Sequence, residues 1–268
     1  MPKKQGFGRM EYHIRVRPGE VARCVLLPGD PARSELIAKK FDEAKEIAYN
    51  REFRTFSGKV DGVPISVTST GIGGPSAAIA VEELARCGAN TFIRVGTAGA
   101  IGKRVKLGDI VIACSAVREE GTSREYVPLS YPAVADLEVT RALIEAAGRL
   151  GVRYHVGVVV SKDAFYAEEP GRVPLSKKTA ELWKIWQRAG ALATEMECAT
   201  IFTVCGVNGW RSGGVLAIVG PAGKIVDPQA GVESAIDVAI AAVKELSKNR
   251  AILNSKDPSG TKWGKDAR

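Results

Sequence analysis

The feature that most constrains the fold is an alternation of short apolar segments with longer segments of helical apolar spacing. Runs typical of buried strands occupy residues 23–28, 91–95, 109–117, 154–161 and 214–219. Helical spacing marks residues 77–87, 137–150, 175–188, 196–207 and 232–246, and another helix is predicted to begin at Pro31. Strands that alternate with helices form mostly parallel sheets covered on both faces.

One pair of segments departs from this alternation. Residues 53–60 and 64–70 alternate in polarity and flank Asp61-Gly62, which predicts an antiparallel hairpin. We find no internal repeat and no linker, so we predict a single α/β domain. Its central sheet is expected to be mixed, mostly parallel and twisted, and flanked by helices.

The positive charge of the chain lies in its two ends. The net charge is +8, but residues 1–10 carry three basic and no acidic side chains, and residues 247–268 carry six basic and two acidic ones. The part between them has no basic stripe with interleaved aromatic residues, so nucleic acid is not an expected partner. We therefore expect a basic N-terminal extension (1–10), a folded domain (11–246) and a polar basic tail that is disordered (247–268).

Two other classes of protein are not expected. No run approaches the ~20 apolar residues of a membrane span, and the first residues contain no apolar segment of a signal peptide, so we expect a cytoplasmic protein. The five cysteines are scattered through apolar segments, as is typical of reduced core residues. Neither His13 nor His155 lies near a cysteine in the sequence, so no metal site is expected.

Glycine turns follow several of the predicted strands. Ligands of open α/β sheets bind at the carboxyl ends of the strands, where Gly29, the run 71–74 and the expected loop 96–102 fall. Arg33, Arg51 and Arg94 are candidate phosphate ligands, because a guanidinium can donate hydrogen bonds to two phosphate oxygens at once. A surface ion pair is the alternative for any one of them taken alone. Arg94 differs, because it interrupts a buried run and there requires an anionic partner.

A dinucleotide-binding fingerprint is a rival interpretation of the second glycine turn. Gly71-Ile72-Gly73 matches the beginning of that pattern, but Ser76 stands where its third small residue is expected. Arg94 lies about where the acidic ligand of the ribose would be required. The sequence therefore favours a phosphate site over a nicotinamide site.

Two carboxylates stand two residues apart, at Glu195 and Glu197. At the end of a strand such a pair points one way and suits a vicinal diol, because an ionised carboxylate only accepts hydrogen bonds. The alternative is an acidic first turn that favours the following helix through its dipole. No glycine-flanked serine, cysteine–histidine pair or HExxH helix offers a covalent nucleophile or a catalytic metal.

Taken together, these motifs closely resemble the nucleoside phosphorylase family, which includes bacterial uridine phosphorylases and hexameric purine nucleoside phosphorylases. The resemblance covers residues 10–246. The segments that carry it are 27–33 (LPGDPAR), 50–53 (NREF), 69–76 (STGIGGPS), 93–100 (IRVGTAGA) and 195–200 (EMECAT).

The resemblance implies a site for each part of a nucleoside and for inorganic phosphate as co-substrate, with no other cofactor and no metal. Catalysis is implied for Arg94 and Glu197. The implied phosphate ligands are Gly29, Arg33, Arg94 and Thr97, with Arg51 from a neighbouring subunit. The implied ribose ligands are Glu195, Met196 and Glu197, with His13 from across the same subunit boundary. Phe165 is the aromatic residue implied to stack on the base. The alternative for His13 is a surface histidine on an N-terminal strand. The implied assembly is a homo-oligomer, a hexamer built as a trimer of dimers.

The departures from the family's pattern concern the base. Uridine phosphorylases bind the pyrimidine with a glutamine and an arginine. In this sequence Glu169 stands near the position of that glutamine, and Arg172 is displaced from the position of that arginine. Pro221 stands where hexameric purine enzymes carry the acid that protonates the base. Residues 117–123 and 132–136 resemble the uridine branch, whereas residues 164–168 resemble a purine and methylthioadenosine branch.

We therefore expect a uridine phosphorylase of nucleotide salvage, with a purine nucleoside or methylthioadenosine phosphorylase as the alternative. A nucleosidase is less expected, because nucleosidases of this fold lack the full set of arginines.

Overall fold

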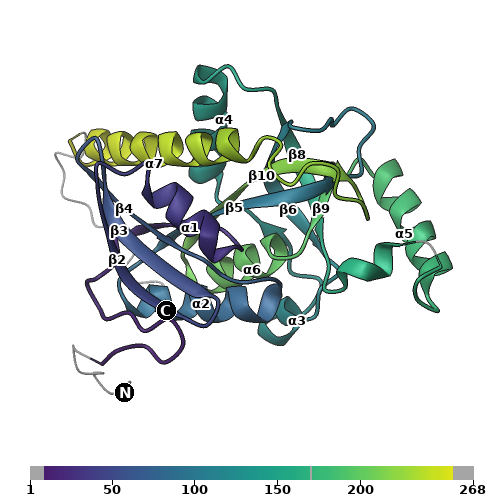
Figure 1. Cartoon of the computed structure of the whole chain (residues 1–268), viewed down its shortest axis with the longest axis horizontal. Coiled ribbons are helices and arrows are strands. Elements are labelled where there is room, and N and C mark those ends of the chain that lie inside the picture. The colour runs from purple at the N-terminus through teal and green to yellow at the C-terminus, as the bar shows by residue number, and fades with distance from the viewer. Residues whose placement is uncertain (1–8, 170, 256–268) are drawn as a thin grey trace.

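The computed structural model describes residues 9–169 and 171–255, with side chains to Lys248 (Figure 1). The strands are β1 (Cys24–Leu27), β2 (Glu43–Asn50), β3 (Phe53–Val60), β4 (Val63–Thr68), β5 (Thr91–Ala100), β6 (Ile110–Arg118), β7 (Ala133–Val134), β8 (Tyr154–Ser161), β9 (Ala193–Glu195) and β10 (Arg211–Pro221). The helices are α1 (Pro31–Ala38), α2 (Gly74–Arg86), α3 (Thr122–Tyr126), α4 (Leu137–Arg149), α5 (Ser176–Arg188), α6 (Cys198–Asn208), α7 (Val232–Ser255) and a 3₁₀ turn, η1 (Phe165–Glu168).

The strands form one mixed sheet, as predicted. Its order is β10-β6-β8-β9-β5-β1-β4-β3-β2, and β7 pairs with β6. Because β10 also pairs with β5, the strands β5, β10, β6, β8 and β9 close into a ring from which the other strands extend. The predicted hairpin is the antiparallel pair β3–β4, and both turn residues, Asp61 and Gly62, have the positive φ that a tight two-residue turn requires.

Helices cover both faces of the sheet (Figure 1). One apolar core joins the strands to α2 and α6, and a second joins them to α1, α4 and α7. Aspartates begin two of these helices: Asp30 accepts from the N–H of Ala32 (2.8 Å) and Asp136 from that of Val139 (2.9 Å). The single α/β domain expected from the sequence is confirmed.

The prediction of a loop at residues 96–102 was wrong for residues 96–100, because β5 continues to Ala100. Gly96, Thr97 and Ala98 pair in parallel with Leu216, Ala217 and Ile218 of β10. The glycines in this stretch lower the propensity for a strand, but a central strand with partners on both sides overrides that preference.

The ends of the domain differ from the expected boundaries in one respect. Helix α7 continues to Ser255, beyond the predicted end of the domain at residue 246. Residues 1–8 of the expected extension and 256–268 of the expected tail lie outside the described residues. Among the helices that are described, none combines the length and the apolar character needed to cross a membrane.

Candidate active site

The carboxyl ends of parallel strands bring the predicted phosphate ligands together. Strand β1 lies between β4 and β5 and is parallel to both, so the turns after β1 and β4 meet at one edge of the sheet. A Cβ atom on Gly29 would lie 3.1 Å from the carbonyl oxygen of Gly71 and 3.4 Å from Nη1 of Arg94. The absence of a side chain at Gly29 therefore lets the backbone approach the Arg94 guanidinium.

Arg94 and Glu197 form a buried ion pair at the centre of this edge. Nη2 of Arg94 lies 2.6 Å from Oε2 of Glu197, and the two side chains are 6% and 3% exposed. The second carboxylate oxygen of Glu197 accepts from the N–H of Gly73 (2.6 Å), and Nη1 of Arg94 donates to the carbonyl of Leu27 (3.3 Å). The anionic partner that the sequence required for Arg94 is therefore Glu197, from a distant part of the chain.

The Arg94 guanidinium keeps unused hydrogen-bonding capacity. Its buried Nε has no hydrogen-bond partner within the described residues, although buried donors are usually paired. A Cβ atom on Gly96 would lie 3.0 Å from Cζ, Nε and Nη2 of Arg94, so the guanidinium packs directly over that glycine. The absence of a side chain at Gly96 thus makes room for the Arg94 guanidinium. The Nε donor of Arg94 is consistent with an anionic ligand.

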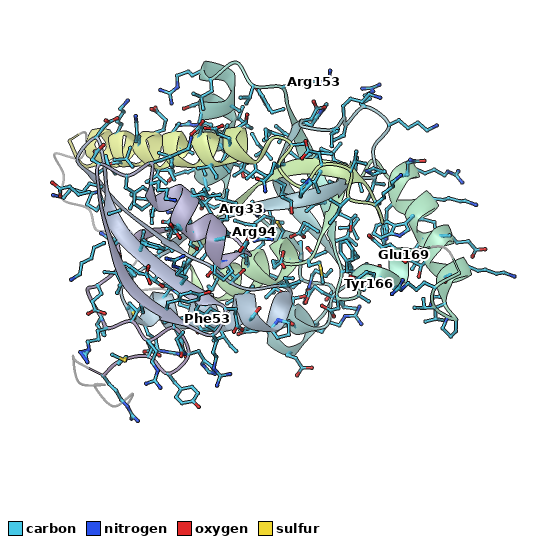
Figure 2. All side chains as sticks on the ribbon, viewed as in Figure 1. Arg33, Phe53, Arg94, Arg153, Tyr166 and Glu169 are labelled. Atoms are coloured by element: carbon cyan, nitrogen blue, oxygen red, sulfur yellow. The ribbon has the colours of Figure 1, made fainter. Side chains whose placement is uncertain are left out.

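A second arginine, Arg33, lies next to Arg94. Burial, and then the positive charge of Arg94, lower the pKa of Arg33, and the carboxylate of Asp30 only partly offsets this effect. In the described part of the chain Arg33 is half-buried and forms no ion pair. Arg33 lies on α1, and Figure 2 shows it close to Arg94. Two adjacent cations repel each other, and a bound dianion would remove that repulsion.

Glu195 is buried and its carboxylate is already bonded. Oε2 accepts from the N–H groups of Glu197 (2.8 Å) and Cys198 (2.9 Å), and Oε1 accepts from the hydroxyl of Ser161. These bonds fix the beginning of α6 and, with it, the backbone of Glu197. Glu195 therefore fits the alternative interpretation, in which a carboxylate stabilises the beginning of a helix. A direct contact between Glu195 and ribose stays a prediction.

Burial most strongly affects the ionisation of Glu197. Loss of water raises the pKa of its carboxyl, the positive charge of Arg94 opposes that rise, and the nearby Glu195 adds to it. The two carboxylates thus differ in environment: Glu195 is held by backbone N–H groups, whereas Glu197 depends on Arg94 and Gly73.

His13 and the turn that carries Arg51 lie together. Nδ1 of His13 is 2.6 Å from Oε1 of the buried Glu83, and the carbonyl of His13 accepts from the side chain of Asn50 (2.7 Å). His13 lies in a turn rather than on the N-terminal strand of the alternative interpretation. Arg51 is exposed and has a φ of +54°, an uncommon backbone conformation that is typically kept for a reason of function or packing. In the described residues neither side chain hydrogen-bonds to Arg94 or Glu197 of the same chain, and their role across a subunit boundary stays a prediction.

The residues predicted to read the base lie on and after η1. Phe165 is 37% exposed, and Arg172 forms an exposed pair with Glu169 (3.0 Å). The Arg172 guanidinium also lies 4.7 Å from the ring centroid of Tyr166. Figure 2 shows Tyr166 and Glu169 on the α5 side of the molecule. Their contacts with a base stay predictions.

Sequence reasoning missed a buried ion pair in the same region. Nζ of Lys162 lies 2.8 Å from Oε1 of Glu168, and the two side chains are 12% and 3% exposed. The other oxygen of Glu168 accepts from the N–H of Gly223 (3.0 Å), so the pair joins β8, η1 and the turn after β10. A usable signal was present, since Lys162 directly follows an apolar strand, as catalytic residues of α/β sheets often do.

Arg94, Arg33, Gly29 and Glu197 therefore share one edge of the sheet, and Thr97 lies half-buried on β5, close by in the sequence. The part of the chain that the structure describes holds no group of three side chains suited to bind a metal ion.

Comparison with known proteins agrees with this architecture. Residues 23–249 match the family model of the phosphorylase superfamily. A uridine phosphorylase of Thermococcus kodakarensis is 53% identical over 89% of this chain and 87% of its own length, and one of Treponema pallidum is 46% identical over 88% and 94%. A guanosine phosphorylase of Halorubrum lacusprofundi is 41% identical over 78% and 82%. The family match spans most of the chain and includes the strand ends that carry Arg94 and Glu197, so the protein belongs to the phosphorylase superfamily.

Proposed function

We propose that the protein cleaves uridine with inorganic phosphate, giving uracil and ribose 1-phosphate. The observation that carries this proposal is the buried Arg94, with the half-buried Arg33 next to it and the carboxylate of Glu197 2.6 Å away. This arrangement suits a ligand pair in which a dianion lies against a sugar. The relatives named as uridine phosphorylases support the choice of nucleoside.

The proposed mechanism depends on exchange of partners at Arg94. Phosphate binds Arg94, Arg33 and the Gly29 N–H, with Thr97 and a neighbour's Arg51 completing the site. Competition for the guanidinium frees one oxygen of Glu197 for the ribose hydroxyls, beside the Met196 backbone and a neighbour's His13. Phosphate then attacks C1′ while the bond to the base breaks, and the developing positive charge on the sugar lies between two anions. The protein contributes position and electrostatics, because the nucleophile arrives already charged.

A substrate panel tests this proposal directly. Uridine, thymidine, inosine, adenosine and methylthioadenosine are each incubated with and without phosphate, and free base and sugar phosphate are measured. We expect turnover of uridine only with phosphate. Equal turnover without phosphate would identify a nucleosidase instead, and binding of NAD would revive the dehydrogenase interpretation.

We expect kcat/KM for uridine to exceed that for inosine. A departing purine carries negative charge that proton donation near N7 relieves, but Pro221 cannot donate a proton. A uracil anion spreads its charge over two carbonyl oxygens and depends less on an acid. Parallel assays of the two nucleosides check this prediction.

Two observations favour the purine alternative: residues 164–168 resemble a purine and methylthioadenosine branch, and a guanosine phosphorylase is 41% identical. More efficient cleavage of inosine or guanosine than of uridine would contradict the choice of base. Glu169 and Asp227, the first acidic residue after Pro221, would then be the candidate proton donors.

We further propose a hexamer of three dimers, in which His13 and Arg51 complete a neighbour's site. Arg51→Ala and Arg94→Ala are each expected to be nearly inactive alone. Mixed by unfolding and refolding, they are expected to recover about a quarter of the wild-type activity, because half of the random dimers carry one intact site of two. Recovery of no activity, or a fully active monomer by light scattering, would contradict shared sites.

We also propose that the protein acts in nucleotide salvage in the cytoplasm. A charged sugar phosphate does not cross an apolar bilayer readily, so the product stays in the compartment where it forms.

A further inference from the structure

A lysine with a side chain that is 12% exposed lies beside the aromatic ring predicted to stack on the base. Nζ of Lys162 is 5.8 Å from the ring centroid of Phe165 and 5.9 Å from that of Trp183. The backbone N–H of Lys162 donates to the carbonyl of Glu195 (3.1 Å), so the residue belongs to the same end of the sheet as Glu197. A cation therefore lies between the proposed sugar site and the proposed base site.

The position of this ammonium group is fixed by two acceptors. It donates to Oε1 of Glu168 (2.8 Å) and to the hydroxyl of Thr194 (2.9 Å). Glu168 is itself held by the N–H of Gly223 (3.0 Å). An ammonium group has three N–H donors, and the described residues occupy two of them. The third has no hydrogen-bond acceptor in the described part of the chain, so it can serve a ligand.

An unpaired donor lies in the same region. The indole Nε1 of Trp183 is buried and has no acceptor in the described part of the chain. Buried donors without partners are uncommon in proteins. Together with Lys162, it makes the neighbourhood of Phe165 rich in donors and suited to a ligand with carbonyl oxygens.

The other cation of this region, Arg172, is in a different environment. Its side chain is 54% exposed and pairs with Glu169, whereas that of Lys162 is 12% exposed. Solvent weakens the interaction of an exposed cation with a nearby charge, and burial strengthens it. Of these two, Lys162 is the better placed to stabilise charge that develops on a bound base.

We propose that Lys162 donates a hydrogen bond to a carbonyl oxygen of the pyrimidine and stabilises the base as it departs. This inference rests on the proposed phosphorolysis of uridine. As a phosphate oxygen bonds to C1′, the C1′–N1 bond breaks and its electron pair passes to the ring, where O2 and O4 share the negative charge. The proton lost by hydrogen phosphate finally resides on uracil, so Lys162 need not give up its own.

The test compares two leaving groups in one variant. Lys162→Met is expected to lower kcat/KM for uridine by about 100-fold, as removal of one donor to a developing anion does. With 5-fluorouridine the loss is expected to be clearly smaller, because fluorine already stabilises the departing anion. A lysine that served only the fold would give equal losses with both substrates.

Two further variants keep the test decisive. Lys184→Met removes an exposed lysine of α5 and is expected to leave both activities unchanged. Since an unpaired Glu168 can destabilise the protein, the double variant Lys162→Met with Glu168→Gln removes both charges and the donor at 162 together, and the same unequal loss is expected. Equal losses, or no loss, in folded variants would overturn the assignment of Lys162. Absence of uridine phosphorolysis in the wild type would instead reject the proposed function.

Discussion

Arg94→Met is expected to lower kcat/KM for phosphorolysis by about 10³-fold or more, since the proposed contact of this buried guanidinium with the attacking phosphate would be lost. The structure supports a large effect, because the Arg94 side chain is 6% exposed, packs over Gly96 and forms an ion pair with Glu197. Assays at saturating and at limiting phosphate measure the effect. The loss is expected mainly at limiting phosphate if Arg94 binds the ground state, and under both conditions if it stabilises the transition state.

A loss of folding has to be separated from a loss of chemistry in this experiment. Arg94→Met leaves the Glu197 carboxylate buried without its partner, which costs about 3–5 kcal/mol. The double variant Arg94→Met with Glu197→Gln is expected to regain much of that stability in thermal unfolding and to remain inactive. Arg141→Met serves as the matched control, because Arg141 forms only an exposed pair with Glu145 on α4. Near-normal phosphorolysis in a folded Arg94→Met protein would refute the phosphate site.

Glu197→Gln is expected to lower kcat/KM by about 10²-fold, because a neutral amide neither binds the diol as strongly nor stabilises the positive charge of the sugar. The variant is also expected to change the pH profile. Burial raises the pKa of Glu197 against the opposing charge of Arg94. As pH falls through that raised pKa, the carboxylate takes up a proton and its interaction with the ribose is lost.

The wild-type kcat/KM is therefore expected to decline on the acidic side at a pH above the usual range of glutamic acid. With the phosphate concentration expressed as that of the dianion, the profile of Glu197→Gln is expected to lack this limb. Glu145→Gln, a change in an exposed carboxylate of α4, should keep both the rate and the limb. An acidic limb that persists unchanged in Glu197→Gln would show that another group titrates.

Most of the local structure followed from the sequence alone. The alternation of apolar runs and helical segments predicted the α/β class, and Asp61-Gly62 predicted the β3–β4 hairpin, because both signals act over a few neighbouring residues. The charge of Arg94 inside a buried run showed that an anion had to face it, since an unpaired charge there would cost too much. In these cases the neighbouring residues in the sequence are enough to predict whether a residue is buried or lies in a turn.

The tertiary structure decided which distant residues meet. Closure of the strands into a ring by the β5–β10 pairing made the glycine-rich stretch after Arg94 part of a strand. The identity of the partner of Arg94, the engagement of Glu195 with α6 and the Lys162–Glu168 pair all join segments that are separate in the chain. A local pattern reports how deeply a residue is buried but not what lies opposite it, because the opposite side is set by how the whole sheet and its helices pack.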